Sequence, residues 1–392
     1  MKITQVNTTV VKIPHHDRFA GQRTRLATFP TSDYYFEEEW QEVYSQNIES
    51  LLVRVDTDEG LHGWGECQAP IVPEAAQAIV DRLLGPMLLG KDPLQTDQLF
   101  EQMCASMNVR GHSTGFMRDA IAGVDIALWD IKGKAMEQSI GSLLAAGAEP
   151  LRTRLPLYVS GLRADTPQAK AELAEACFDE GYAAVKVYLG RGVEKDIRIA
   201  ETLWRQLDDQ GRLLSDLLWS YRLPDAMQLC RVLQDCRFEW IEAPLAVEDI
   251  EGHARLARAL DVAVAAGEAL RSHHQFATWM ERGAMRIVQP DVARCGITGA
   301  RDVARLARQH GLPVAFHVGV CLGIAVAATW QLAAATPNYY LQEHQPPPFE
   351  LSNRFFHEKL EVCRGQAVVP DRPGLGVDVV VETLKRQMRT SR

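Results

Sequence analysis

The sequence predicts an α/β protein in which a (β/α)8 TIM-type barrel follows a smaller α+β domain. The chain has 392 residues, too many for one average domain and enough for a barrel with a partner domain. From residue 155 onward, eight short apolar runs alternate with helix-length segments. Eight alternating units favour a closed parallel barrel over an open doubly wound sheet.

The predicted barrel strands are separated by clear helix signals. Thr166-Pro167 opens one helix, Pro224 opens another, and Thr298 is expected to cap a third. The apolar segment 321–335 is expected to be a helix packed on the barrel, because it is too short to span a bilayer. The strands are predicted at 155–160, 183–188, 212–217, 237–242, 262–266, 285–289, 313–317 and 339–343.

The first part of the chain lacks this alternation. A strand is predicted at 48–55, with a DEG turn and a returning strand through LHGWGEC, and helices are predicted at 73–84 and 118–136. We expect residues 1–135 to form a capping domain and residues 136–370 to form the barrel. The tail, residues 371–392, is expected to pack back on the capping domain.

Residues 15–46 have no clear period, and a loop of that length inside a compact domain is usually functional or mobile. Its aromatic residues either line a lid over the site or plug the space between the domains; they are Tyr34, Tyr35, Phe36 and Trp40. Glu37–Glu39 are expected to face solvent, because they would repel an anionic substrate.

Polar residues recur at one fixed interval. Asp216, Glu242 and Glu268 are each 26 residues apart, and each closes a short apolar run. A strand, a helix and two loops take about that many residues, so each acid is expected at a strand end, where barrel strands converge. Three converging carboxylates repel one another unless a cation lies between them, which favours a hard divalent metal over three solvated acids. The same interval separates Asp291, His317 and Glu343.

Composition excludes several classes of function. The formal net charge of −9, with no long basic block, disfavours a nucleic-acid surface. The N-terminus has no signal-like apolar core and no segment is long enough to cross a membrane, so a cytoplasmic protein is expected. The eight cysteines form no CxxC pair and are expected to be reduced and mostly buried.

The segment Ala120–Lys134, AIAGVDIALWDIKGK, resembles the signature helix of the enolase superfamily, in its mandelate racemase/muconate lactonizing branch. Further matches cover nearly the whole chain: GWGEC, WIEAPL, AAGEAL, QPDVARCGIT, AFHVGV and PGLGV. The resemblance implies an α+β cap over a modified barrel, one Mg²⁺ per subunit, and abstraction of a proton α to a carboxylate. It also implies a homo-oligomer.

The resemblance assigns roles to the polar residues. Asp216, Glu242 and Glu268 resemble the three metal ligands. His317 and Asp291 resemble the His–Asp dyad of the mandelate racemase subgroup, in which the carboxylate fixes the imidazole tautomer and raises its basicity. The muconate lactonizing subgroup would have a lysine after strand six, and none is present.

The sequence departs from the family pattern in two places. Lys186 is retained, but the second lysine of the usual Lys-x-Lys is replaced by Tyr188, which is either a base or only a hydrogen-bonding group. The usual Asn two residues after the first metal ligand is replaced by Leu218, which cannot ligate or hydrogen-bond.

Three further residues have open roles. Glu343 either donates a hydrogen bond to an enediolate oxygen, which requires a raised pKa, or is an exposed strand-end acid. Arg271 and Arg294 either hold a distal carboxylate or hydroxyl, or are surface residues.

The leading hypothesis is a Mg²⁺-dependent acid-sugar dehydratase, a hydro-lyase acting through a metal-stabilised enediolate. It would eliminate the β-hydroxyl and yield a 2-keto-3-deoxy sugar acid. One good acid/base group can suffice for this reaction, whereas reversible racemisation through two bases is disfavoured by Tyr188. The alternatives are a racemase, epimerase or lactone cycloisomerase of the same branch, and a non-catalytic metal- and ligand-binding relative.

Overall fold

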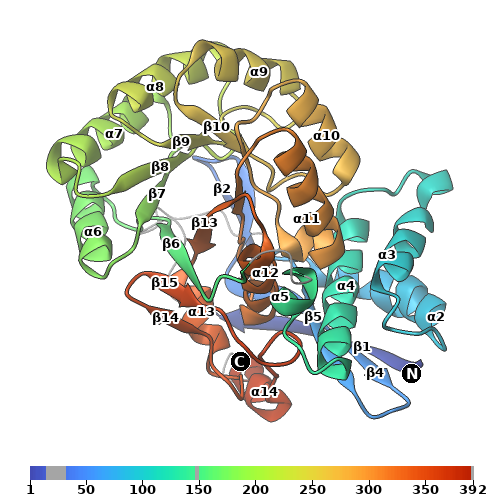
Figure 1. Cartoon of the computed structure of the whole chain (residues 1–392). Helices are drawn as coiled ribbons and strands as arrows, with labels where there is room; N and C mark the ends of the chain where they lie inside the picture. The colour runs from blue at the N-terminus through green and yellow to red at the C-terminus, as the bar shows by residue number, and fades with distance from the viewer. Residues whose placement is uncertain (15–31, 146–149, 390–392) are drawn as a thin grey trace.

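The computed structural model describes residues 1–14, 32–145 and 150–389. Figure 1 shows a ring of helices around a central set of strands, with the N-terminal sheet and its helices packed beside and below the ring. The predicted fold class, a modified TIM-type barrel with an α+β cap, is confirmed. The exact domain boundaries remain a prediction.

The cap contains an antiparallel sheet in the order β1-β4-β5, covered by the long helix α4. The predicted hairpin is present, since β4 and β5 pair in an antiparallel register. Helix α4 packs so closely on this sheet that no side chain fits at position 65. A Cβ added to Gly65 would lie 1.8 Å from the Gly123 carbonyl oxygen. The elements are β1 (Ile3–Pro14), β4 (Asn47–Thr57), β5 (His62–Cys67) and α4 (Phe116–Ala135).

The remaining elements of the cap are short. The helix predicted at 73–84 is present, and its last turns are π-helical. Strands β2 (Tyr34–Glu37) and β3 (Glu42–Ser45) form a two-stranded hairpin that the sequence did not predict. The helices are α1 (Pro73–Ile79), η1 (Val80–Leu84), α2 (Gly85–Leu88), α3 (Thr96–Ala105) and η2 (Asn108–Arg110).

In the described residues, eight parallel strands pair in chain order from β6 to β13, and β13 pairs with β6 to close the barrel. All eight predicted strands are present, with ends shifted by a few residues. They are β6 (Arg154–Ser160), β7 (Ala184–Tyr188), β8 (Arg212–Asp216), β9 (Trp240–Glu242), β10 (Ala263–Ala266), β11 (Ile287–Val288), β12 (Val314–Phe316) and β13 (Tyr339–His344).

Helices follow the strands and form the outer ring (Figure 1). Thr166 caps α6 through its side chain, and Pro224 lies in the first turn of α8, as predicted. The helices are α5 (Ile140–Ala145), α6 (Pro167–Asp179), α7 (Val193–Leu207), α8 (Leu223–Asp235), α9 (Ile250–Ala259), α10 (His273–Glu281), α11 (Val292–Gln309), α12 (Gly323–Ala335), α13 (Pro346–Ser352) and α14 (Val381–Arg389). In a hairpin of β14 (Glu361–Cys363) and β15 (Gln366–Val368), β15 pairs antiparallel with the first residues of β6, 154–156.

One layer of side chains fills the barrel interior, with one residue from each strand. Side chains alternate along a strand, so polar residues that lie two positions further along most of these strands point to the same interior above the layer, at the mouth. The layer consists of Tyr158, Ala184, Leu214, Trp240, Ala265, Ile287, Ala315 and Leu341.

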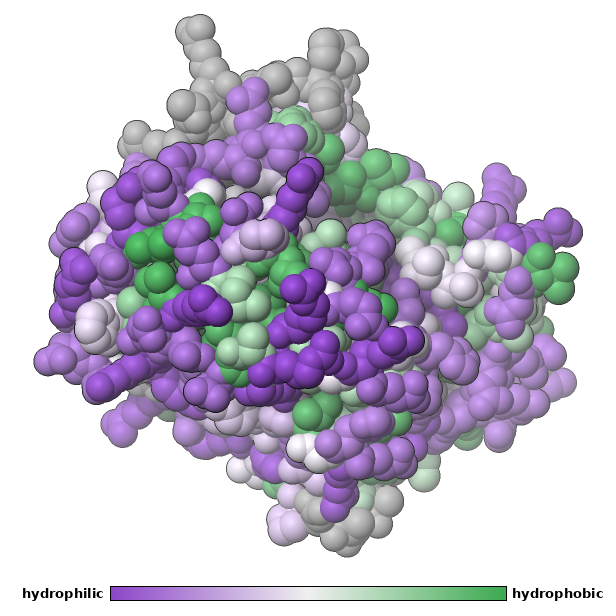
Figure 2. Space-filling model, turned by 90° about the horizontal axis from the view of Figure 1, so that it is seen from above, coloured by the Kyte–Doolittle hydropathy of each residue, from purple (hydrophilic) through white to green (hydrophobic). Residues whose placement is uncertain are grey.

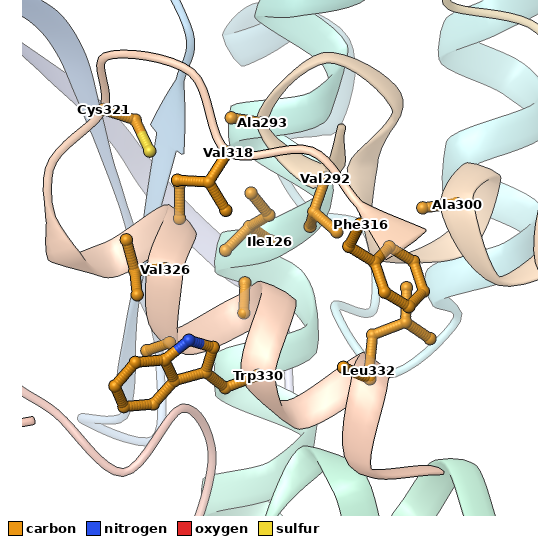
Figure 3. Close-up of a cluster of buried hydrophobic side chains, with 14 of the residues drawn as sticks. Ile126, Val292, Ala293, Ala300, Phe316, Val318, Cys321, Val326, Trp330 and Leu332 are labelled. Carbon is orange, nitrogen blue, oxygen red and sulfur yellow. The ribbon is translucent and has the colours of Figure 1, made fainter. Parts of the chain in front are cut away.

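The cap and the barrel share one hydrophobic core. Figure 3 shows Ile126 of α4 beside Val292 and Phe316 of the barrel, above Trp330 of α12. Helix α14 of the tail packs against β1. The cap is therefore fixed to the barrel by buried apolar contacts, and side chains from both can be held in one site.

The prediction that Thr298 caps a helix is wrong. Helix α11 begins at Val292 with Asp291 as its N-cap, and it kinks at Gly296, where φ is 73°. The kink brings the Thr298 backbone N–H within 2.9 Å of a carboxylate oxygen of Asp125 from α4. Gly296 separates two helical segments of α11, and Thr298 lies at the start of the second, where its N–H and hydroxyl donate to Asp125 of α4.

The face shown in Figure 2 is mostly hydrophilic, with hydrophobic residues in small groups between polar ones. None of the helices in the described ranges combines the length and apolar character that a bilayer crossing requires. All eight cysteines lie in the described residues as free thiols, and five of them are buried, as expected.

Candidate active site

A cavity of about 730 Å³ lies at the barrel mouth, beneath the β2–β3 hairpin. Its floor is made by residues at the strand ends, and its other walls come from the cap, including Tyr35, Tyr44 and Trp40. Trp40 connects the hairpin to the barrel by a hydrogen bond, in which its indole N–H donates to the Leu189 carbonyl oxygen at 2.9 Å. Of the four aromatic residues expected in a lid or in a plug between the domains, Tyr35 and Trp40 line this cavity. Residues 15–31 lie outside the described residues.

The prediction that Glu37 faces solvent is wrong. It is 9% exposed, because strand alternation places it on the same face of β2 as the buried Tyr35. Glu38 and Glu39 are exposed, and Glu39 pairs with Lys195 of α7 at 3.0 Å. The hairpin thus rests on the barrel through both apolar and charged contacts.

The three predicted metal ligands lie together at the mouth. Asp216 ends β8 and is paired in register with Glu242, which ends β9. Glu268 lies two residues after β10, beyond Gly267. Burial, and then the charges of Glu242 and Glu268, raise the pKa of Asp216 well above its ordinary value. The acids therefore repel one another across a shared space.

Lys186 is buried among the acids. Its Nζ is 2.8 Å from Glu242, 3.0 Å from Glu343 and 3.4 Å from Asp216. Burial opposes its charge, but Glu242 and Glu343 overcome that effect and raise the pKa of Lys186 well above its usual range. Lys186 is thus held as a cation at the floor of the cavity.

Tyr188 reaches the same cavity from the same strand. Its hydroxyl is 2.9 Å from the Ser160 hydroxyl, and its ring meets the Trp40 ring edge to face at 6.5 Å. Burial raises the pKa of Tyr188 above its ordinary value, and the nearby Lys186 only partly offsets this. The tyrosine is therefore a neutral phenol in this setting.

His317 follows β12 and is oriented by Asp291, whose carboxylate is 2.7 Å from the imidazole Nδ1. Asp291 is itself fixed, because it accepts the Ala293 backbone N–H at 2.8 Å as the N-cap of α11. The other ring nitrogen, Nε2, lies 2.8 Å from Glu268. Burial opposes protonation, but the charges of Glu343 and Glu268 and the Asp291 hydrogen bond raise the pKa of His317 well above its usual value.

Glu343 is buried, with 2% of its surface exposed, so the alternative that it is an exposed acid at a strand end is wrong. One oxygen accepts the Val318 backbone N–H at 3.0 Å, and the other is 3.0 Å from Lys186. Burial acts to raise the pKa of Glu343, but Lys186 and His317 lower it below its ordinary value. Glu343 is thus a carboxylate, whereas donating to an enediolate would need a raised pKa.

The donor set fits a hard divalent cation. In the described part of the chain, Glu242, Glu268 and His317 offer ligand atoms that all lie within 4.8 Å of one another. The third predicted acid, Asp216, is adjacent to Glu242. Carboxylate oxygens are the ligands that Mg²⁺ and Ca²⁺ prefer, and a cation among these acids would relieve their mutual repulsion.

Some residues of the site were missed by sequence reasoning. Gln289 donates to Glu242 at 2.7 Å, and the Trp219 indole N–H donates to Glu268 at 2.7 Å. Arg294 lines the cavity and contacts Gln68 of the cap, while Arg271 is turned away to Asp119. Gln289 lies directly after β11 and two residues before Asp291, so strand periodicity could have found it, but Trp219 has no such signal.

Two family models match this chain. "Enolase C-terminal domain-like" matches residues 169–383, and "Mandelate racemase / muconate lactonizing enzyme, N-terminal domain" matches residues 43–145. A D-galactarolactone cycloisomerase of Agrobacterium fabrum is 32% identical over 344 residues, covering 84% of this chain and 88% of that protein. A D-galactonate dehydratase of Variovorax paradoxus is 30% identical over 357 residues, covering 86% of this chain and 91% of that protein.

Solved structures resemble the whole chain. A member of the enolase superfamily from Agrobacterium tumefaciens has a TM-score of 0.92 at 30% identity, covering 97% of this chain and 98% of that one. A racemase from Streptomyces coelicolor with bound magnesium has a TM-score of 0.85 at 25% identity, covering 98% and 99%.

Proposed function

Because this chain belongs to the mandelate racemase/muconate lactonizing branch of the enolase superfamily, we propose that it is a Mg²⁺-dependent dehydratase of sugar acids. That it is an enzyme follows from its relatives, which are dehydratases and cycloisomerases. Which of these two reactions this chain catalyses is the proposed part, and we favour dehydration. The observation that carries it is the asymmetry of the acid/base groups around the cavity.

His317 is the acid/base group best prepared for proton transfer. Asp291 orients its ring through Nδ1, and its Nε2 faces the cavity, where it lies 2.8 Å from Glu268, a carboxylate that a bound metal would engage. Lys186 and Tyr188 are poor bases, since the lysine is paired with three carboxylates and the phenol is bonded to Ser160. A site with one effective acid/base group suits an elimination in which the same group takes a proton and returns it.

Asp216, Glu242 and Glu268 would hold the metal. Bound Mg²⁺ would supply Lewis-acid stabilisation of the negative charge that develops on the substrate carboxylate. The Lys186 ammonium, buried behind two of these acids, adds a second positive charge on the same side. The magnesium bound by the racemase from S. coelicolor supports the choice of this ion.

The chain's own residues would perform the proton transfers. Once Glu268 serves as a metal ligand, its contact with His317 is given up, and Nε2 takes the C2 proton of the sugar acid while Asp291 stabilises the imidazolium that forms. The electron pair of the C2–H bond first passes into the carboxylate group, giving an enediolate. It then forms the C2–C3 double bond as the C3–O bond breaks. His317 gives its proton to the departing hydroxyl, which leaves as water in a syn elimination. The enol then tautomerises to the 2-keto-3-deoxy acid.

Lactone cycloisomerisation is the second candidate, because a D-galactarolactone cycloisomerase is 32% identical to this chain over most of its length. It also begins with removal of a proton α to a carboxylate, so His317 would serve it with the same geometry. The two reactions differ in the leaving group, which is a hydroxyl in one and the ring oxygen of a lactone in the other.

A product screen separates the candidates. Purified protein with Mg²⁺ is incubated in D₂O with aldonic acids, aldaric acids and their lactones, and the products are followed by NMR. We expect a 2-keto-3-deoxy acid and loss of one water from at least one open-chain acid. Turnover of lactones alone favours the cycloisomerase. Solvent deuterium at C2 without water loss identifies a racemase or epimerase, and no product or exchange from any acid favours the non-catalytic relative.

A further inference from the structure

Trp219 is placed to fix one of the three proposed metal ligands. Its indole N–H donates to Glu268 Oε1 at 2.7 Å, while the other oxygen of Glu268 faces His317 at 2.8 Å. We propose that Trp219 is a positioning residue that orients Glu268 for the metal. This inference rests on the proposed function, because it assumes that Glu268 is a ligand.

Glu268 needs such a partner more than the other two acids do. Asp216 and Glu242 are the last residues of strands, and their backbones are held by the ladder of the barrel. Glu268 lies beyond the end of β10, after Gly267 with φ of 145°, and its side chain is 16% exposed. Glu242 also has fixed partners of its own in Lys186 and Gln289.

The chain departs from ordinary backbone geometry to put the indole there. Leu218 and Trp219 both have left-handed backbone conformations, with φ of 52° and 57°. Two hydrogen bonds hold this turn: Leu218 N–H donates to the Asp216 carboxylate at 3.0 Å, and Trp219 N–H donates to the Ala243 carbonyl oxygen at 2.7 Å. Two consecutive non-glycine residues in this region are costly, so the turn indicates a constraint at the site.

The indole is also braced from behind. Trp219 meets Trp279 edge to face at 6.2 Å and lies 5.8 Å from the ring of His253, which is fully buried. These rings restrict the indole to one orientation, which makes its N–H a rigid donor. Leu218, where the family pattern has Asn, cannot fill a polar role beside the metal ligands. The adjacent Trp219 supplies a donor at that place.

The test is Mg²⁺ affinity without substrate, measured by isothermal titration calorimetry on wild type, W219F and W279F. Partners that orient a metal ligand are typically worth about 10- to 100-fold in metal affinity, so W219F should bind Mg²⁺ more weakly by that factor. The matched control W279F disturbs the same aromatic group but leaves the Trp219–Glu268 hydrogen bond, and its affinity should stay within about threefold of wild type. Circular dichroism checks that each variant is folded.

A second measurement does not depend on either variant. Mg²⁺ added to the wild-type protein should change its tryptophan emission with the midpoint found by calorimetry, because the indole is bonded to a ligand. The role of Trp219 is overturned if W219F binds Mg²⁺ as tightly as wild type, or if W219F and W279F lose affinity by the same factor. It is also overturned if saturating Mg²⁺ leaves the tryptophan emission of wild type unchanged. Wild-type protein that binds no Mg²⁺ overturns the proposed function itself, which distinguishes the two failures.

Discussion

The two sides of the barrel mouth contain titratable groups whose partners differ strongly. On the His317 side, Asp291 orients the ring through Nδ1, and Nε2 faces the cavity, where its partner is Glu268, a proposed metal ligand. On the Lys186 side, Lys186 has three carboxylate partners, and Tyr188 is bonded to Ser160. The difference teaches that burial alone does not make a catalyst. A proton-transfer group needs one fixed contact and one position left for the substrate.

Replacing the histidine should have the largest effect. H317N removes the base and the acid of the proposed elimination, and positioned general acid–base groups contribute up to about 10⁴-fold to rate. We expect kcat to fall by about that factor for any sugar acid that wild type dehydrates. The measurement is formation of the 2-keto-3-deoxy acid under single-substrate conditions.

The control for H317N is Mg²⁺ affinity by calorimetry, which should remain measurable, so that lost turnover is not caused by a lost metal. A variant that retained more than about a tenth of the wild-type rate would place the base on the Lys186 side.

On the Lys186 side, the large effect should be on stability. K186M leaves Asp216, Glu242 and Glu343 buried without the ammonium that contacts all three, and breaking a buried charge group typically costs about 3 to 5 kcal/mol. The free energy of unfolding, measured by urea denaturation in EDTA, should fall by that amount. K385M is the matched control, because Lys385 is 53% exposed and its pairing with Glu382 is a surface contact. Equal stabilities of K186M and K385M would contradict the description of Lys186 as the charge that holds these acids together.

The sequence was sufficient to predict the elements that recur with a regular period. The eight strands and the acids at their ends follow from a repeat that any (β/α)8 chain must keep, so Asp216, Glu242 and His317 were placed at the mouth. The hairpin β2–β3 was missed because its strands have four residues each and their period is too short to detect. Its lid position depends on Trp40 meeting a carbonyl 149 residues away.

The protonation states and the indole donor could not be read from the sequence either. Glu343 is held as a carboxylate by Lys186, which is 157 positions earlier in the chain, so its charge is a tertiary property. Trp219 points at Glu268 only because two left-handed residues turn the backbone. Periodicity contains no information on such a turn, and Trp219 in the sequence is simply an aromatic residue after a strand.

A second histidine sharpens the comparison, because His344 at the end of β13 is buried and has no carboxylate partner among the described residues. It stacks on Tyr182 and meets Phe349 edge to face, and burial lowers the pKa of His344 to about 4. A histidine whose folded pKa lies below its unfolded value stabilises the fold above the unfolded pKa, and this stability is lost as pH falls. Between pH 7 and 5, the loss should be about 2 kcal/mol.

The variant H344F isolates this contribution, since phenylalanine keeps the ring contacts and does not titrate. Unfolding free energies of both proteins are measured at pH 7 and pH 5, and wild type should lose about 2 kcal/mol more than H344F. An identical loss in the two proteins would mean that the neighbouring rings do not disfavour the imidazolium. The contrast with His317, whose pKa is raised by carboxylates, would then lose its basis.

The smallest effect is expected for Y188F. Because burial raises the pKa of Tyr188 and its hydroxyl is bonded to Ser160, the phenolate that a base requires is disfavoured at any pH where the protein is assayed. Removing the hydroxyl deletes one hydrogen bond, worth about 1 kcal/mol, so kcat/KM should fall by less than about tenfold. S160A removes the partner of the same bond and should behave alike. A loss of 10³-fold or more in Y188F alone, with a small loss in S160A, would show that the hydroxyl acts on the substrate. The Lys186 side would then contain a second proton-transfer group, and a two-base isomerase would explain the site better than a dehydratase.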